Sequence, residues 1–112
     1  MRLMALVAGT LLLFCISQNV NAAFKTGNAL YDDCTSDSPP KRTLCLGYVT
    51  GFSDAREELG LMCPAKGVDV RQMIDVVVKY LSDHPEVRQH YTASDKVGLA
   101  LEKAFPCKEQ AH

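Results

Sequence analysis

The cysteines constrain this 112-residue chain more than any other feature. Cys15 lies in an apolar stretch near the N-terminus, and four more cysteines follow it at positions 34, 45, 63 and 107. The four later cysteines are an even number, which in a small exported chain predicts two disulfides with three possible connectivities. A metal site is the alternative, but the chain has no CxxC pair and no cysteine at ligand spacing from a histidine. The pattern favours disulfides, and we expect no metal ion or other cofactor.

Residues 1–22 have the layout of a secretory signal peptide. A basic residue at Arg2 is followed by an apolar run over residues 3–16 and by a polar stretch that ends in small residues. This order predicts cleavage after Ala22. The alternative is a membrane span, but the apolar run is shorter than the roughly 20 residues that cross a bilayer. We therefore expect Cys15 to leave with the leader, and residues 23–112 to form one soluble exported domain.

The mature chain has about 90 residues, which is near the lower size limit for a self-sufficient core. The full sequence has 12 basic and 13 acidic residues, and loss of Arg2 leaves 11 and 13, a net charge of −2. No cationic surface is therefore expected for nucleic acid or for an anionic membrane.

Hydrophobic periodicity predicts an all-α domain of four helices. The expected helices cover residues 24–34, 45–59, 69–83 and 86–104. The third is the clearest, since its apolar residues recur at intervals of three and four and Asp69 is suited to cap it. Pro85 suits the first position of the fourth helix, whereas Gly98 in its middle is unfavourable by about 1 kcal/mol relative to alanine.

The stretch CLGYVTGFSDA, residues 45–55, contains Gly47 and Gly51 one helical turn apart. A phosphate-binding loop is one interpretation, but the chain lacks the preceding strand and the lysine that such a loop needs. The apolar residues have helical spacing instead. We therefore expect the two glycines to allow close packing by a neighbour, either another helix of the same domain or a second subunit.

The order of the helices also predicts the disulfides. Short connections make successive helices antiparallel. Cys34 and Cys45 then lie near one end of the bundle, and Cys63 and Cys107 lie near the other. We expect the pairs Cys34–Cys45 and Cys63–Cys107.

Several short motifs, taken in their order, resemble the Rap/Tai family of periplasmic immunity proteins. They are FxTGNxL at 24–30, Cys34, CxGYVxG at 45–51 followed by Asp54-Ala55, CxxxGV at 63–68, the segment 72–81, His84-Pro85-Glu86, and Ala104-Phe105-Pro106-Cys107. Characterised members neutralise peptidoglycan amidase effectors of type VI secretion. The resemblance implies a small, helical, disulfide-bonded domain, often dimeric, that occludes the active site of a secreted toxin.

The turn at residues 82–88 is the expected toxin-contacting segment, because it connects two long helices and proline restricts it. The candidate contact residues are Asp83, His84, Glu86 and Arg88. A tight helical connection without a binding role is the alternative. Elsewhere, Asp54 is expected to make a structural hydrogen bond, and the acidic run at 32–37 to be a solvated face.

Two other classes of function remain open on the sequence alone. A periplasmic chaperone or acid-stress holdase is also small and helical, and it would have to expose apolar surface at low pH. An envelope interaction protein would have the same general features. An enzyme is not expected, because no HExxH helix and no nucleophile in a catalytic motif is present.

Overall fold

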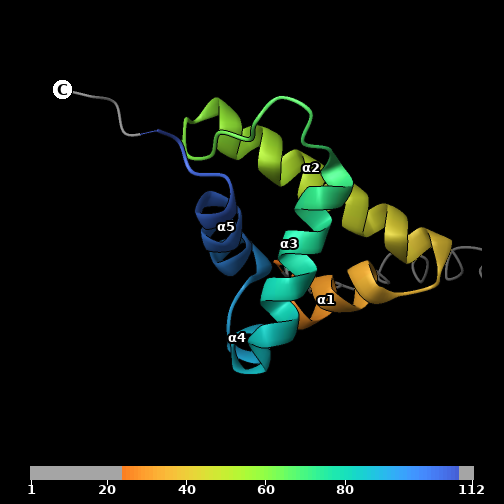
Figure 1. The fold of residues 1–112 in the computed structure, drawn as a ribbon. Coiled ribbons are helices and arrows are strands. Elements are labelled where there is room, and N and C mark those ends of the chain that lie inside the picture. The colour runs from red at the N-terminus through yellow and green to blue at the C-terminus, as the bar shows by residue number, and fades with distance from the viewer. Residues whose placement is uncertain (1–23, 109–112) are drawn as a thin grey trace, which may run out of the picture.

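The computed structural model describes residues 24–108, so the expected leader at residues 1–22 lies outside the described part. The described residues form five α-helices, which are α1 (Gly27–Thr35), α2 (Pro39–Glu58), α3 (Val70–Asp83), α4 (Pro85–His90) and α5 (Ala93–Ala104). The predicted all-α class is confirmed. In Figure 1, α3 runs from the region of α2 at the top to α4 at the bottom, with α5 beside it. No helix within residues 24–108 is both long and apolar enough to cross a membrane.

The expected fourth helix is divided into α4 and α5. Tyr91 and Thr92, between them, have extended backbone conformations. These residues pair with the segment before α1. The Gly27 N–H donates to the Tyr91 carbonyl at 3.2 Å, and the Ala93 N–H donates to the Lys25 carbonyl at 2.9 Å. Pairing between distant segments therefore interrupts the helix, an effect that periodicity does not reveal.

Capping residues determine where two of the helices begin. Asp69 accepts a hydrogen bond from the Gln72 N–H, and the Gln72 side chain accepts from the Asp69 N–H, so that α3 has a complete capping box. The second helix begins earlier than expected, because Pro39 and Pro40 occupy its first positions. Proline is favoured there since the first helical N–H groups have no partner in the helix. The loop before α2 is therefore only residues 36–38.

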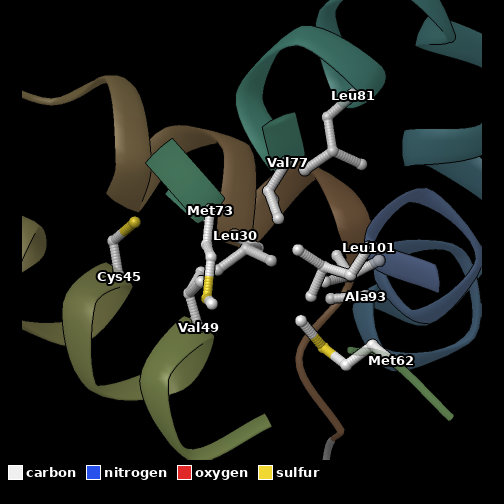
Figure 2. Packing of buried hydrophobic residues seen from close by; sticks show 10 residues of the cluster. Leu30, Cys45, Val49, Met62, Met73, Val77, Leu81, Ala93 and Leu101 are labelled. Carbon is white, nitrogen blue, oxygen red and sulfur yellow. The ribbon is translucent and has the colours of Figure 1, made fainter. Parts of the chain in front are cut away.

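The core lies where α1, α2, α3 and α5 meet (Figure 2), and Figure 2 shows side chains from these helices pointing toward one another. Its fully buried large side chains are Leu30, Val49, Met62, Val77, Leu81, Val97 and Leu101. Each such side chain stabilises the fold by about 1.5–3 kcal/mol relative to exposure. The side chains of Tyr48, Phe52 and Tyr80 are half-buried and pack against the edge of this core.

The disulfides join Cys34 to Cys45 and Cys63 to Cys107, the pairs that helix order predicts. The first connects the C-terminal turn of α1 to α2. The second connects the loop after α2 to the segment after α5, where the Cys63 N–H also donates to the Phe105 carbonyl at 2.9 Å. Both ends of the domain are thus covalently closed.

One member of the acidic run is not solvated. Asp33 is 6% exposed, and its carboxylate lies 2.5 Å from the ammonium group of Lys25. Lys25 belongs to the segment that pairs with residues 91–93. The ion pair therefore holds this N-terminal segment against α1, in contrast to the solvated face that the sequence suggested for Asp33.

Candidate partner-binding surface

The connection between α3 and α4 is a single residue, His84. It lies outside the helical region of backbone angles, at φ −128° and ψ 66°, and Pro85 follows it as the first residue of α4. A residue before proline is disfavoured in the helical conformation, because the proline ring collides with its backbone. The sequence His84-Pro85 therefore ends α3 and starts α4 in one step, as expected.

The His84 side chain is held against the end of α3. Its ring stacks on Tyr80 with 4.4 Å between ring centroids. The ring Nδ1 lies 2.8 Å from the Tyr80 carbonyl oxygen, which only accepts hydrogen bonds. Nδ1 therefore carries the hydrogen, and in the neutral ring Nε2 is left as an acceptor. The half-buried imidazole is a fixed group.

The carboxylates on either side of His84 are exposed. Asp83 forms an ion pair with Lys79 one turn earlier on α3, at 2.9 Å. Exposed pairs of this spacing contribute only about 0.3–0.5 kcal/mol, so a partner can compete for either charge at little cost. Glu86 lies exposed in the first turn of α4, and it has no ion-pair partner within residues 24–108. We name Asp83, His84 and Glu86 the turn surface.

Arg88, the fourth candidate, is used inside the fold. Its guanidinium lies over the Tyr31 ring, 4.1 Å from the centroid, and its Nε is buried without a hydrogen-bond partner. Its backbone packs on Gly27, where an added Cβ would lie 2.8 Å from the Arg88 Cα. Arg88 therefore fastens α4 to α1. The Arg88 N–H donates to the His84 carbonyl at 3.2 Å, but its side chain is used against Tyr31 and does not join the turn surface.

A groove beside the turn surface extends it along α3 and α5. Its volume is about 310 Å³, and its lining is mostly apolar. Val76 and Tyr80 from α3 face Ala100 and Ala104 from α5, and Lys103 borders the groove. The sequence analysis missed this groove, because it exists only where two helices that are separate in the chain pack together. The small side chains of Ala100 and Ala104 on α5 are its only sequence signal.

The two glycines of α2 have no neighbour in the described chain. Gly47 and Gly51 are exposed, and nothing lies within 4 Å of a Cβ built at either position. The structure contradicts the expectation that another helix of the same domain packs there. A phosphate loop is also ruled out, since both glycines lie inside a continuous helix. Packing against a second subunit stays a prediction.

The titratable side chains of the described residues do not gather into a metal site. No cluster of three His, Cys, Asp or Glu side chains suited to a metal ion occurs within residues 24–108. Burial raises the pKa of Tyr48, and a hydrogen bond between the Tyr48 and Ser94 side chains offsets part of that increase. A hydrogen bond to Asp32 raises the pKa of Lys41. Neither Tyr48 nor Lys41 belongs to the turn surface.

Comparison with known proteins identifies one family. Residues 26–107 match the profile of Rap1a immunity proteins, which spans all five helices and all four cysteines of the described domain. Searches of curated proteins and of solved structures found no match. The matched segment covers well over half of the chain and agrees with the resemblance that the motifs indicate. The chain therefore belongs to the Rap1a immunity protein family.

Proposed function

We propose that this protein is a periplasmic immunity protein that binds a peptidoglycan amidase effector of type VI secretion and occludes its active site. The observation that carries the proposal is the match to the immunity family over residues 26–107. Immunity proteins generally act by binding an effector, and membership in this family implies such a partner. The amidase class and the periplasmic location are the proposed refinements.

The two disulfides support the proposed location. Disulfides form and persist in oxidising compartments such as the periplasm, and they are rare in reducing cytosol. All four cysteines after the expected leader are paired. The effector would attack peptidoglycan in the same compartment, where an immunity protein has to meet it. The expected signal peptide at residues 1–22 would deliver the chain there.

The turn surface is the proposed contact with the effector. It stands at the α4 end of α3, away from α2 (Figure 1), and offers two exposed carboxylates beside a fixed imidazole. Because Pro85 and the Tyr80 stack already restrict it, little conformational entropy would be lost on docking. The apolar groove next to it would bury a side chain from the rim of the amidase cleft.

We also propose that α2 forms a contact between two copies of the chain. Leu44, Gly47 and Gly51 follow one another at intervals of three and four on an exposed face, and Leu44 is 57% exposed. Missing side chains at the glycines would let a second helix approach closely. Light scattering after size exclusion tests this: replacing Gly51 with leucine should shift a dimer to a monomer with an unchanged circular dichroism spectrum.

The test of the proposed function is periplasmic protection. A peptidoglycan amidase effector of type VI secretion is directed to the periplasm of a Gram-negative host, with and without this protein. We expect cell lysis without the protein and normal growth with it. Continued lysis in cells that contain the folded, oxidised protein would reject the amidase as its target.

A general chaperone is separated from an immunity protein by a second measurement. An immunity protein should not suppress the light scattering of an unrelated unfolding client at neutral or acid pH, whereas a holdase should. Suppression of client aggregation together with no protection against the amidase would move the protein to the chaperone class.

A further inference from the structure

A second cavity lies at the opposite end of α3 from the turn surface. Its volume is about 370 Å³, and it separates the C-terminal half of α2 from the loop that leads into α3. Ligand pockets generally start at about 300 Å³, so this one has room for one large side chain. None of its lining residues belongs to the turn surface.

One wall of this cavity is acidic. Thr50, Asp54 and Glu57 of α2 line it at helical spacing, and both carboxylates are exposed. Neither carboxylate takes part in an ion pair within the described residues 24–108, and Asp54 does not make the hydrogen bond that the sequence suggested. Two like charges one helical turn apart repel each other slightly. A cation bound between them would remove that repulsion.

A buried hydroxyl in the same lining lacks a partner. Ser53 is 3% exposed, and its Oγ has no hydrogen-bond partner among the described residues. A buried polar group without a partner costs about 1–3 kcal/mol, so native structures usually supply one. A ligand that donates several hydrogen bonds would satisfy this oxygen and the nearby carboxylates together.

The facing wall is apolar and held in place. Pro64, Val68 and Met73 line it, and the loop that carries the first two begins at the disulfide of Cys63 with Cys107. The Val68 N–H also donates to the Ala65 carbonyl at 3.1 Å, which closes a turn in this loop. Such a wall suits a hydrocarbon stem, and its covalent anchor keeps the cavity open before a ligand arrives.

We propose that this cavity binds an arginine side chain of a protein partner. A guanidinium has five N–H donors in a planar arrangement that matches carboxylates, and its methylene stem packs on apolar surface. Lys66 at the rim is the only cationic lining residue, against two carboxylates, so the lining favours a cation over an anion. Arginine binding in this cavity does not depend on whether the partner is an amidase.

The test is an NMR titration of the oxidised ¹⁵N-labelled protein with Nα-acetyl-arginine amide. We expect saturable shifts confined to the amides of residues 50–57 and 65–68. The neutral isostere Nα-acetyl-citrulline amide should produce none, because it lacks the positive charge. The double variant Asp54→Asn, Glu57→Gln should bind the arginine probe at least tenfold more weakly. Ser53→Ala should weaken it several-fold.

Asp75→Asn is the matched control, since Asp75 is an exposed carboxylate of α3 that does not line the cavity. This variant should bind the arginine probe as the unmodified protein does. The amide spectra of all variants also report whether the fold is intact. Non-saturable shifts, equal shifts with the citrulline probe, or full binding by the double variant would overturn the proposal. Unchanged affinity of Ser53→Ala for the arginine probe would overturn the role of the Ser53 hydroxyl in it.

Discussion

Removal of the Cys63–Cys107 disulfide should destabilise the domain more than most single substitutions do. The bridge closes a loop with a sequence separation of 44 residues. In the chain-entropy model, a loop of this length stabilises the native state by about 4 kcal/mol. Small domains have total stabilities of about 5–15 kcal/mol, so this one bridge supplies a large share.

This bridge is also the cleaner of the two for measuring the entropic effect. Cys63 is exposed and Cys107 is half-buried, so replacing both with alanine leaves little cavity. Cys45, in contrast, is 2% exposed within the core, and its replacement would add a loss of packing to the loss of the bridge. The double variant Cys63→Ala, Cys107→Ala therefore isolates the closure of the long loop.

Urea unfolding followed by circular dichroism, without reductant, measures the effect. We expect the free energy of unfolding to fall by about 4 kcal/mol and the Tm to fall by about 15–30 °C. The m-value should rise, because the unfolded chain without the bridge is less compact and exposes more surface. A loss below about 1 kcal/mol with an unchanged m-value would refute the argument that loop closure holds this end of the domain.

Four further substitutions test the packing and the alkaline titration of the domain. In the monomer, Gly27→Ala should lose about 1–3 kcal/mol, because its Cβ would collide with the Arg88 backbone. Gly47→Ala should gain up to about 1 kcal/mol there, because its Cβ meets nothing in the described chain, and equal effects in urea unfolding would contradict the packing of α1 on α4. Asp33→Ala should lose about 2–3 kcal/mol, since it leaves the Lys25 ammonium group without its buried partner, and a neutral effect would show that the ion pair is dispensable. Because burial raises the pKa of Tyr48, the folded state holds the phenol proton more tightly than the unfolded state does. The contribution of Tyr48 to stability is therefore complete below about pH 10 and declines as the pH rises through the folded pKa. Tyr48→Phe should flatten that alkaline decline in thermal unfolding, and an unchanged decline would assign it to other groups.

Local sequence signals predict the ends of several elements in this fold. Asp69 marks the start of α3 and Pro85 the start of α4, because capping and proline geometry depend on adjacent residues. The break at residues 91–92 is different, since it results from pairing with residues 25–27 at the other end of the domain. Periodicity over residues 86–104 carries no information about that distant partner.

The candidate contact residues show the same division. The exposure of Asp83 and Glu86 follows from their position beside a helix break, which the sequence displays. The inward position of Arg88 depends on Tyr31 and on the missing side chain at Gly27, both of which lie in α1. The groove between α3 and α5 depends on how the two helices pack. Contacts between distant segments therefore decide which residues of the turn are available to a partner.

Peptidoglycan hydrolysis by the amidase effector, titrated with the purified protein, tests the proposed function most directly. We predict that hydrolysis stops near one immunity protein per amidase. For the same inhibition, the double variant Asp83→Ala, Glu86→Ala should be needed at a concentration at least tenfold higher, a loss of about 1.4 kcal/mol in binding free energy, while its Tm is unchanged. The control Asp75→Ala should inhibit as the unmodified protein does. Full hydrolysis in the presence of excess folded protein would contradict immunity by occlusion, and equal inhibition by the double variant would contradict the role of the turn surface.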